Sequence, residues 1–225
     1  MSLDLIYAVP GTTIETWESD LAAAVALAPE HVSAYALTWE DATPYHAWRA
    51  RGRLRPLADD TEAAMAETTV AHLEAAGFRR YEISSFARPG RESRHNVGYW
   101  DGSDYLGVGP GAHSFSATPA PGRRWSNERL PARWLADVAA RGVAIATEER
   151  LTGAQARAEF VFTGLRRLAG VDAVAFERRF GTSLHAAFPQ LVRLADDGLV
   201  EDAAGRVRLT ARGLAFADSV GAELV

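Results

Sequence analysis

The chain has 225 residues, of which 48% are hydrophobic and 24% are charged, the composition of a globular protein that buries a core without covalent cross-links. A formal net charge of −5 and a pI near 5.7 give no global electrostatic argument for nucleic-acid binding. The chain has no cysteine, which excludes disulfides, zinc–thiolate sites, thiol nucleophiles and thiolate-bound iron–sulfur clusters from it.

The cytoplasm is the expected location of the protein. No apolar run approaches the length of a membrane span, and no signal peptide is visible at the N-terminus. The absence of cysteine is consistent with a reducing compartment.

The N-terminal region predicts a βαβ unit. Leu3–Tyr7 has the apolar pattern of a buried strand, and His31–Thr38 has that of a second one. Between them, Thr12 followed by Glu15 predicts a capping box at the start of a helix, and Pro29 ends that helix. The apolar positions of the expected helix share one face: Ile14, Trp17, Leu21, Val25 and Ala28. A right-handed crossover follows, with the loop after the first strand at the ligand-binding end.

The next segment alternates between irregular and regular structure. Residues 39–57 contain two prolines and a glycine, and we expect them to be irregular. Asp59 and Glu62 predict the start of a helix that runs to about residue 76, with Gly77 as its C-terminal cap. The inner face of this helix is expected to carry Met65, Thr69, Leu73 and Ala76. Residues 80–86 alternate weakly and predict one strand.

The stretch from Arg94 to Ser114 is the most unusual part of the chain. It contains two histidines, two tyrosines, one tryptophan and five glycines, and no helix or strand period fits it. The spacing His95-Asn96-x-x-Tyr99-Trp100 places an imidazole, a carboxamide and two amphipathic rings close together. Glycines at 107, 109 and 111 allow close approach of the backbone to a neighbour. These features predict a binding site, and the alternative is a packed crossover whose glycines only form turns.

Two features follow this stretch. Residues 119–124 are rich in proline and glycine and predict a surface loop. A helix is expected to begin at Pro131 and to end at Gly142. The composition changes after Ala146.

The C-terminal tail predicts a winged-helix pattern of helices and a hairpin. Thr152 and Gln155 predict the cap of a helix that runs to about Leu168. The remaining expected elements are a helix over 172–180, a helix over 183–197 weakened by Pro189, a hairpin over 199–209 and a last helix after Thr210. The helix over 183–197 has Arg193 as its only cation and ends in two aspartates, so no binding to nucleic acid is expected.

Several polar residues are candidates for binding. Asp4 interrupts an apolar strand, and a buried carboxylate there needs a partner, either a ribose or ammonium group of a ligand or a neighbouring loop. The turn over residues 10–13 leads into a helix N-terminus, which suits anions or simply caps the helix. A histidine beside tyrosine and tryptophan suits a flat iron macrocycle, because imidazole ligates iron and aromatic rings stack. The other histidines are expected to be solvated or partly packed: His31, His46, His72 and His185.

Five segments carry a resemblance to a known family. They are DLIYAVPGTT, HVSAYALTWEDATPY, YEISSFARPG, RHNVGYW and YLGVGPGAHS, in this order. In sequence and spacing they resemble the HemW family of radical S-adenosylmethionine proteins, which are similar to oxygen-independent coproporphyrinogen III oxidase. The HNxxYW element is specific to the heme-chaperone branch, and the tail from about Glu148 resembles the family's C-terminal domain. One departure is YAVPGTT, where the family usually has YGLPGQT.

The resemblance implies an α/β fold in two parts. Residues 1–147 would form the C-terminal part, from the fifth strand onward, of a partial TIM-type (β/α)6 barrel. Residues 148–225 would form a small winged-helix-like α+β domain. The family's CxxxCxxC loop, which holds a 4Fe-4S cluster, is expected to be absent, in agreement with the lack of cysteine. This chain alone is therefore expected to be unable to cleave S-adenosylmethionine.

The resemblance also implies two sets of binding residues. The positions that match the S-adenosylmethionine pocket are Asp4, Ile6 and Ala36. The positions that match the heme-binding element are His95, Asn96, Tyr99 and Trp100, and His113 lies where the related oxidase lines a second ligand pocket. We expect His95 to ligate heme iron and Arg94 to pair with a propionate, and the alternative iron ligand is His113.

The functional interpretations that stay open are three. The first is a heme chaperone that binds heme and passes it to an acceptor protein. The second is an oxidase that acts on a porphyrinogen, and the third is a non-catalytic winged-helix binding module. In each case the strand Leu3–Tyr7 is expected to be an exposed sheet edge that promotes self-association.

Overall fold

The computed structural model describes residues 1–41 and 43–224 of the chain. They divide into two compact units, unit 1 (Met1–Ser93) and unit 2 (Arg94–Val225). Ala42, which lies in the segment expected to be irregular, and Val225, the end of the expected C-terminal domain, are outside the described residues. Within the described residues, no helix is long and apolar enough to cross a membrane. Helices and strands occur in both units, which confirms the mixed α/β class.

Unit 1 is built on a mixed four-stranded sheet in the order β1-β2-β4-β3. Its described elements are β1 (Ser2–Tyr7), α1 (Ile14–Ala26), β2 (His31–Ala36), α2 (Pro44–Ala50), α3 (Asp59–Ala75), β3 (Arg79–Arg80) and β4 (Ser85–Ala87). β1 and β2 are parallel, with Ser2 opposite His31 and Tyr7 opposite Ala36, whereas β2 and β4 are antiparallel. β1 is an edge strand of this sheet, as expected.

The start of α1 lies one residue later than predicted. The hydroxyl of Thr13 accepts a hydrogen bond from the Thr16 amide (3.3 Å), and the Thr16 hydroxyl accepts one from the Thr13 amide (2.9 Å). Thr12 instead donates its hydroxyl to the carbonyl oxygen of Val9 (2.7 Å) and closes the preceding turn. The predicted cap at Thr12 and Glu15 is therefore wrong, because a threonine at the N3 position replaces the expected glutamate.

The core of unit 1 lies between α1, α3 and the sheet. Trp17 and Leu21 of α1 are buried against Met65 and Leu73 of α3. The indole N–H of Trp17 donates to the hydroxyl of Thr69 (2.9 Å), so the one polar group on this face is satisfied. The predicted inner face of α3 is confirmed at Met65, Thr69 and Leu73.

Two segments of unit 1 differ from the prediction. Residues 39–57 contain α2, whose first turn is capped by the Thr43 hydroxyl and begins with Pro44, a residue preorganised for that position. Residues 80–86 form two short antiparallel strands and a tight turn instead of one strand. The carboxylate of Glu82 closes this turn by accepting from the Ser84 amide (3.1 Å).

Unit 2 contains two three-stranded sheets, in the orders β5-β6-β7 and β8-β10-β9. Its described elements are α4 (Arg94–Trp100), β5 (His113–Ser116), β6 (Arg123–Asn127), α5 (Pro131–Arg141), β7 (Ile145–Arg150), α6 (Gly153–Leu165), β8 (Val171–Asp172), α7 (Ala173–Phe180), α8 (Leu184–Ala187), α9 (Gln190–Asp196), β9 (Val200–Ala203), β10 (Arg206–Leu209), α10 (Ala211–Ala215) and α11 (Ala217–Ala222).

The C-terminal tail follows the predicted order of elements, with three differences. The capping box of Thr152 and Gln155 is confirmed, and so is the hairpin of β9 and β10. Pro189 does not merely weaken the helix over 183–197 but separates α8 from α9, because proline cannot donate the hydrogen bond that would continue α8. The last helix is interrupted at Phe216, and the short strand β8 adds to the hairpin.

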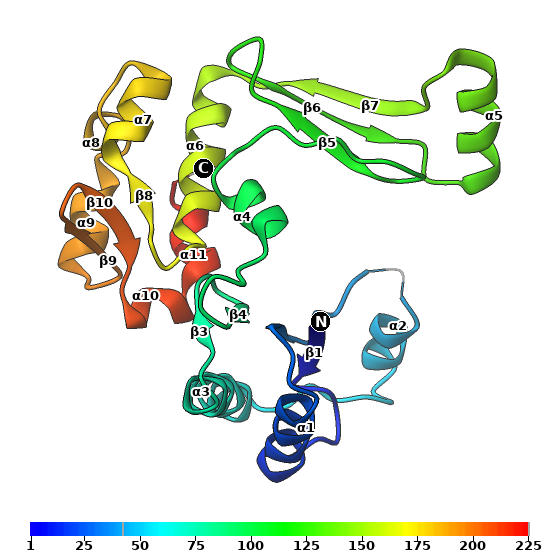
Figure 1. Cartoon of the computed structure of the whole chain (residues 1–225), viewed down its shortest axis with the longest axis vertical. Helices are drawn as coiled ribbons and strands as arrows, with labels where there is room; N and C mark the ends of the chain where they lie inside the picture. The colour runs from blue at the N-terminus through cyan, green and yellow to red at the C-terminus, as the bar shows by residue number, and fades with distance from the viewer. Residues whose placement is uncertain (42, 225) are drawn as a thin grey trace. The chain divides into compact units, whose positions relative to one another are not determined.

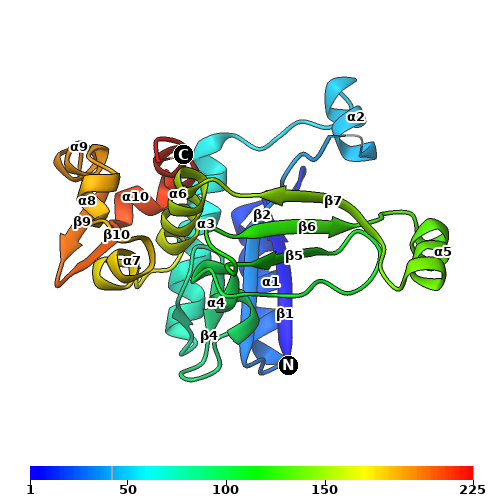
Figure 2. The ribbon, with the colours of Figure 1, turned by 90° about the horizontal axis from the view of Figure 1, so that it is seen from above.

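The sheet β5-β6-β7 was not predicted. It is antiparallel and extends from α6 at one end to α5 at the other (Figures 1 and 2). α5 begins at Pro131 and ends at Gly142, whose φ of +73° is the left-handed cap expected there. Residues 119–122 form the turn between β5 and β6, and the predicted loop ends where β6 begins at Arg123.

Candidate functional site

The residues proposed for S-adenosylmethionine lie in unit 1 and divide between the two faces of its sheet. Asp4 and Ile6 are exposed on one face of β1. Ala36 is opposite Tyr7, whose side chain packs on the core, so Ala36 belongs to the other face. The expectation that Asp4 is buried is wrong, because the alternate positions Leu5 and Tyr7 are the ones that face the core.

His31 is another difference in unit 1, because it was expected to be solvated or partly packed and is buried. Its side chain is 6% exposed, and its two ring nitrogens lie 3.0 Å from the Ser2 hydroxyl and 2.8 Å from the Tyr81 hydroxyl. Burial lowers the pKa of His31, and the charges of Asp4 and Glu82 act in the opposite direction. Both ring nitrogens of this histidine therefore have hydrogen-bond partners within unit 1.

The residues proposed for heme lie in unit 2, and four of them are on one short helix. α4 contains His95, Asn96, Tyr99 and Trp100, so the prediction of irregular backbone is wrong for this segment. The helix lacks an apolar period of its own and forms against α6, which it contacts. Residues four apart on a helix share a face, and the rings of His95 and Tyr99 are 4.6 Å apart at 70°.

A row of aromatic rings continues from α4 to β5. The ring of Tyr99 meets that of Tyr105 edge-on at 4.5 Å, and Tyr105 in turn lies 6.1 Å from Phe115. Tyr105 is fixed by two backbone hydrogen bonds with Phe115, of 2.9 and 3.0 Å. Burial raises the pKa of the Tyr105 phenol, and the neighbouring Tyr99 acts in the same direction. The row begins at an exposed imidazole, His95, and ends inside unit 2.

Two cavities accompany this row. A cavity of about 420 Å³ is lined by Arg94, His95, Tyr99 and Tyr105, among others. A second, of about 400 Å³, has walls of Tyr99, Trp100, Phe115 and Phe160 and is called the aromatic cavity below. The Trp100 indole N–H is buried and has no hydrogen-bond acceptor among the described residues. An aromatic cavity with an unsatisfied donor at its wall suits a flat ligand with a polar edge.

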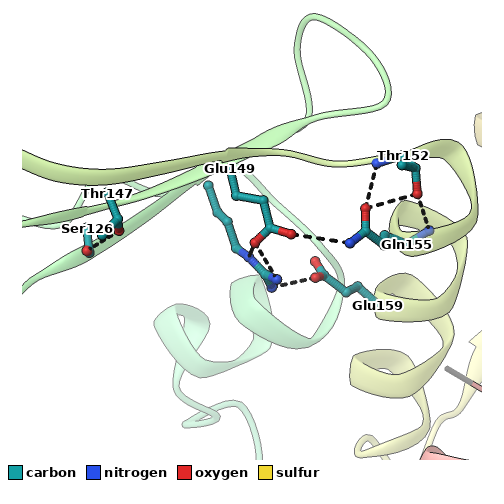
Figure 3. Close-up of polar contacts among 7 residues, drawn as sticks. Ser126, Thr147, Glu149, Thr152, Gln155 and Glu159 are labelled. Carbon is teal, nitrogen blue, oxygen red and sulfur yellow. Dashed lines mark hydrogen bonds and ion pairs between the residues drawn. The ribbon is translucent and has the colours of Figure 1, made fainter.

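A polar network closes one wall of the aromatic cavity. Arg124 of β6 pairs with Glu149 of β7 (2.8 Å) and also with Glu159 of α6. Figure 3 shows how Glu149 also receives a hydrogen bond from Gln155 (3.2 Å), so the capping box of α6 is connected to the sheet. Burial raises the pKa of Glu159, and the charge of Arg124 offsets only part of this shift.

Arg124 and Glu159 were missed by the sequence analysis. For Arg124, the signal that was available is the charge pattern of RRWSN and TEER, in which Arg124 lies directly opposite Glu149. Glu159 belongs to α6 and had no such signal. Opposite charges directly across a strand pair favour pairing of those strands.

Close backbone packing and side-chain hydrogen bonds hold the glycine-rich loop after α4 in place. A Cβ on Gly107 would lie 2.1 Å from the carbonyl oxygen of His113, so only glycine fits there. The Gly107 amide donates to the Ser114 hydroxyl (2.9 Å), and the Asn127 amide group donates to the carbonyls of Gly107 (3.3 Å) and Gly109 (2.9 Å). His113 itself is exposed at the start of β5 and lines neither cavity.

The structure therefore brings His95, Tyr99 and Trp100 to the walls of two cavities and does not bring His113 to them. Among residues 1–41 and 43–224, no group of three or more histidine, aspartate or glutamate side chains is arranged to hold a metal ion. Because the chain also has no cysteine, its residues do not fit a 4Fe-4S cluster.

Comparisons with known proteins all find similarity to HemW and HemN proteins. The model of the HemN C-terminal domain matches residues 151–216. The heme chaperone HemW of Bacillus subtilis is 34% identical over 98% of this chain and 57% of its own length. That of Mycobacterium tuberculosis is 36% identical over 98% of this chain and 54% of its own length. The predicted resemblance to the HemW family is confirmed.

The HemW-like chain spans only about half the length of these curated relatives. Heme chaperone HemW of Escherichia coli is 30% identical over 97% of this chain and 56% of its own length. Among solved structures, the radical SAM enzyme coproporphyrinogen III oxidase (HemN) from Escherichia coli matches with a TM-score of 0.76 at 20% identity. That match covers 99% of this chain and 54% of the oxidase. At this identity it shows a shared fold.

Proposed function

We propose that this chain is part of a heme chaperone of the HemW family and that it binds heme on unit 2, beside α4. The proposal rests on one observation above all. His95, a residue type that ligates heme iron, is exposed at the end of a row of aromatic rings that leads into a cavity. The similarity to proteins named heme chaperone HemW supports the same ligand.

In this proposal each residue of the α4 motif has a role. The neutral imidazole of His95 coordinates the iron, and Tyr99 or Trp100 covers a face of the porphyrin. Asn96 belongs to the same helix but lines neither cavity, and it is proposed to contribute hydrogen bonding to the ligand. His113 is kept as the alternative iron ligand, because it is exposed and lies at the other end of the glycine-rich loop.

Replacement of single histidines tests this assignment. His95→Ala is expected to abolish or shift the Soret band of the heme complex with little change in melting temperature, because His95 is exposed. His113→Ala is expected to leave the band largely intact, and His72→Ala, on α3 of unit 1, is the matched control. An unchanged spectrum and stoichiometry in His95→Ala would remove this residue from the site.

The finer features of the fold are proposed on the same basis. Unit 1 and the region up to residue 147 would correspond to the later strands of a partial radical SAM barrel, and residues 148–225 to a winged-helix-like domain. The order of elements from α6 to α11 and the match to the HemN C-terminal domain support the second part. Asp4, Ile6 and Ala36 are retained as the proposed S-adenosylmethionine positions, with Ala36 at the carboxyl end of β2.

The alternative function is that of a porphyrinogen oxidase, which the fold shared with coproporphyrinogen III oxidase supports. For this chain alone we propose no such activity. Anaerobic reconstitution with iron and sulfide is expected to give no 4Fe-4S absorbance, because no thiolate is available. Cleavage of S-adenosylmethionine by this chain would overturn that expectation.

The partners are proposed as heme and a protein that accepts it. Self-association through the edge strand β1 is proposed as well, because an edge strand presents unpaired backbone groups. Light scattering that shows a monomer over a wide concentration range would contradict it. The expected absence of nucleic-acid binding and the expected cytoplasmic location stay predictions.

A further inference from the structure

A third cavity of unit 2, of about 520 Å³, is lined by four arginines. Arg167 follows α6, Arg178 and Arg179 belong to α7, and Arg206 belongs to β10. The cavity also contains Asp101 and Asp172 in its wall, so its charged groups carry an excess of positive charge. We call it the arginine cavity.

The two aspartates are already occupied by structural contacts. Asp172 accepts from the Ala175 amide (2.9 Å) as the cap of α7 and pairs with Arg206 (3.0 Å). Asp101 accepts from the amide and the hydroxyl of Ser103. Neither aspartate forms an ion pair with Arg167 or Arg178 among the described residues, although the charge of Arg178 acts on Asp172.

The four arginines differ in their contacts: Arg206 and Arg179 make hydrogen bonds, and the charge of Arg178 acts on Asp172 and helps to lower its pKa. Arg206 is paired as described, and Arg179 donates to the carbonyl oxygen of Gly102 (3.2 Å) while its guanidinium lies 5.1 Å from the centre of the Phe160 ring. The side chains of Arg167 and Arg178 have no hydrogen bond or ion pair within the described part of the chain. Arg167 is half-buried, and a half-buried cation without a partner favours an anionic ligand.

The arginine cavity adjoins the aromatic cavity. Trp100, Phe160 and Arg179 line both of them, so the tryptophan of the α4 motif lies where the two cavities meet. Gly102 leaves the room that Arg179 occupies, because a Cβ at this position would lie 3.0 Å from the Arg179 Nη1 atom. A ligand that covers Trp100 in the aromatic cavity thus has the arginine cavity at its edge.

We propose that the arginine cavity binds the carboxylates of a planar tetrapyrrole, with Arg167 and Arg178 as the residues that contact them. The inference rests on the proposed function, in which the macrocycle lies against α4. Guanidinium groups match carboxylates through two parallel N–H···O bonds, and heme carries two carboxylates on one edge. The cavity then fixes which edge of the macrocycle enters unit 2.

The test compares hemin with hemin dimethyl ester, in which both carboxylates are blocked, by Soret titration of the whole chain. The variants are Arg167→Gln, Arg178→Gln and the double variant. Arg133→Gln is the control, because Arg133 is exposed on α5 and has no ion pair within the described residues. Each single variant is expected to weaken hemin binding about tenfold, the effect of losing one charge-assisted hydrogen bond, and the double variant about a hundredfold. All three are expected to leave binding of the ester unchanged.

The possible results separate this inference from the function on which it rests. If hemin binds the unaltered chain and the double variant equally, the arginine cavity is not the carboxylate site, and the heme proposal stands. If the double variant loses hemin and its ester to the same extent, the arginines act on the fold and the inference is overturned. If the unaltered chain binds neither compound, both proposals fail. Melting temperatures of all variants accompany the titrations. They are expected to be within about 2 °C of the parent, because the side chains of Arg167 and Arg178 make no hydrogen bond or ion pair within the described residues.

Discussion

Residues 158–224 and residues 94–143 belong to the same unit but are stabilised in different ways. The first region contains a cluster of buried apolar side chains from α6 to α11, including Phe176 and Leu194, both fully buried. The second contains no buried apolar side chain, and Ser114 and Gly122 are its only buried residues. It is held instead by hydrogen bonds between strands, by edge-to-face contacts of aromatic rings, and by the contacts of Asn127 and Gly107.

The difference indicates what each region can do. A packed apolar cluster fixes a fold but offers no groups to a ligand, because its side chains are occupied with one another. The second region keeps His95 exposed and Tyr99, Trp100 and Tyr105 half-exposed, and these groups are available at cavity walls. Binding groups and stability are thus supplied by different parts of unit 2.

The largest effect is expected from the apolar cluster. Phe176 is fully buried, and its ring lies 4.8 Å from that of Phe180 and 6.0 Å from that of Phe188. Phe176→Ala removes these contacts and leaves a cavity, so the free energy of unfolding should fall by about 3–5 kcal/mol. Urea unfolding followed by circular dichroism measures it. Leu135→Ala, at a position 61% exposed in the other region, should change stability by less than about 0.5 kcal/mol. Equal losses would contradict the contrast.

Glycines of the second region give an intermediate effect with opposite signs. Gly107→Ala places a Cβ 2.1 Å from the carbonyl oxygen of His113. Because this oxygen belongs to the backbone and cannot move aside as a flexible side chain would, the free energy of unfolding should fall by about 1–3 kcal/mol. Gly98→Ala, within α4, meets only Ser103 at 3.9 Å and should stabilise the helix by about 0.5–1 kcal/mol. Thermal melting of both variants provides the comparison. A neutral Gly107→Ala would mean that the loop adapts freely.

The hydrogen bonds from the Asn127 side chain to the glycine-rich loop, called the Asn127 clamp below, should give a smaller and local effect. Asn127→Ala removes both hydrogen bonds to the loop carbonyls, and the expected loss is about 1–2 kcal/mol. Amide hydrogen exchange of residues 105–114 should accelerate more than global unfolding does. Ser126→Ala is the neighbouring control, because its hydroxyl bonds only to Thr147 at an exposed position of the sheet. Equal acceleration in both variants would assign the effect to the sheet instead of the clamp.

The same contrast explains what the sequence could predict. In unit 1, apolar residues recur with the period of the element, so the inner face of α3 was located correctly. In the C-terminal tail, the capping box of Thr152 and Gln155 located the start of α6. The strands β5, β6 and β7 contain no buried apolar residue, and their pairing depends on partners distant in sequence. Periodicity carries no information there, and the sheet β5-β6-β7 was missed.

The candidate site was predicted in composition but not in geometry. The density of aromatic and imidazole groups located His95, Tyr99 and Trp100, but not the helix that aligns two of their rings. Arg167 and Arg178 were not considered, because they lie more than 60 residues from the α4 motif and reach the same cavity only through the fold. Long-range placement of this kind has no signal in one sequence.

The smallest effect concerns the pH dependence of unit 1, where His31 is buried although the sequence predicted a solvated or partly packed side chain. Burial lowers the pKa of His31 below its ordinary value of about 6.5, so the unfolded chain takes up a proton at a higher pH than the folded chain does. The stabilisation by neutral His31 is therefore complete above about pH 6.5, and it is lost as the pH falls from there through the folded-state pKa.

The measurement is the melting temperature of the whole chain between pH 7.5 and pH 5. His31→Gln should lower the melting temperature at pH 7.5, because its contacts with Ser2 and Tyr81 are changed, and should also make the decline toward pH 5 shallower. The slope, and not the absolute value, reports the proton. His72→Gln replaces a histidine of α3 whose ring makes no hydrogen bond within the described residues, and it should keep the slope of the parent. Equal slopes in the parent and in His31→Gln would show that burial of this imidazole does not govern the acid sensitivity of unit 1.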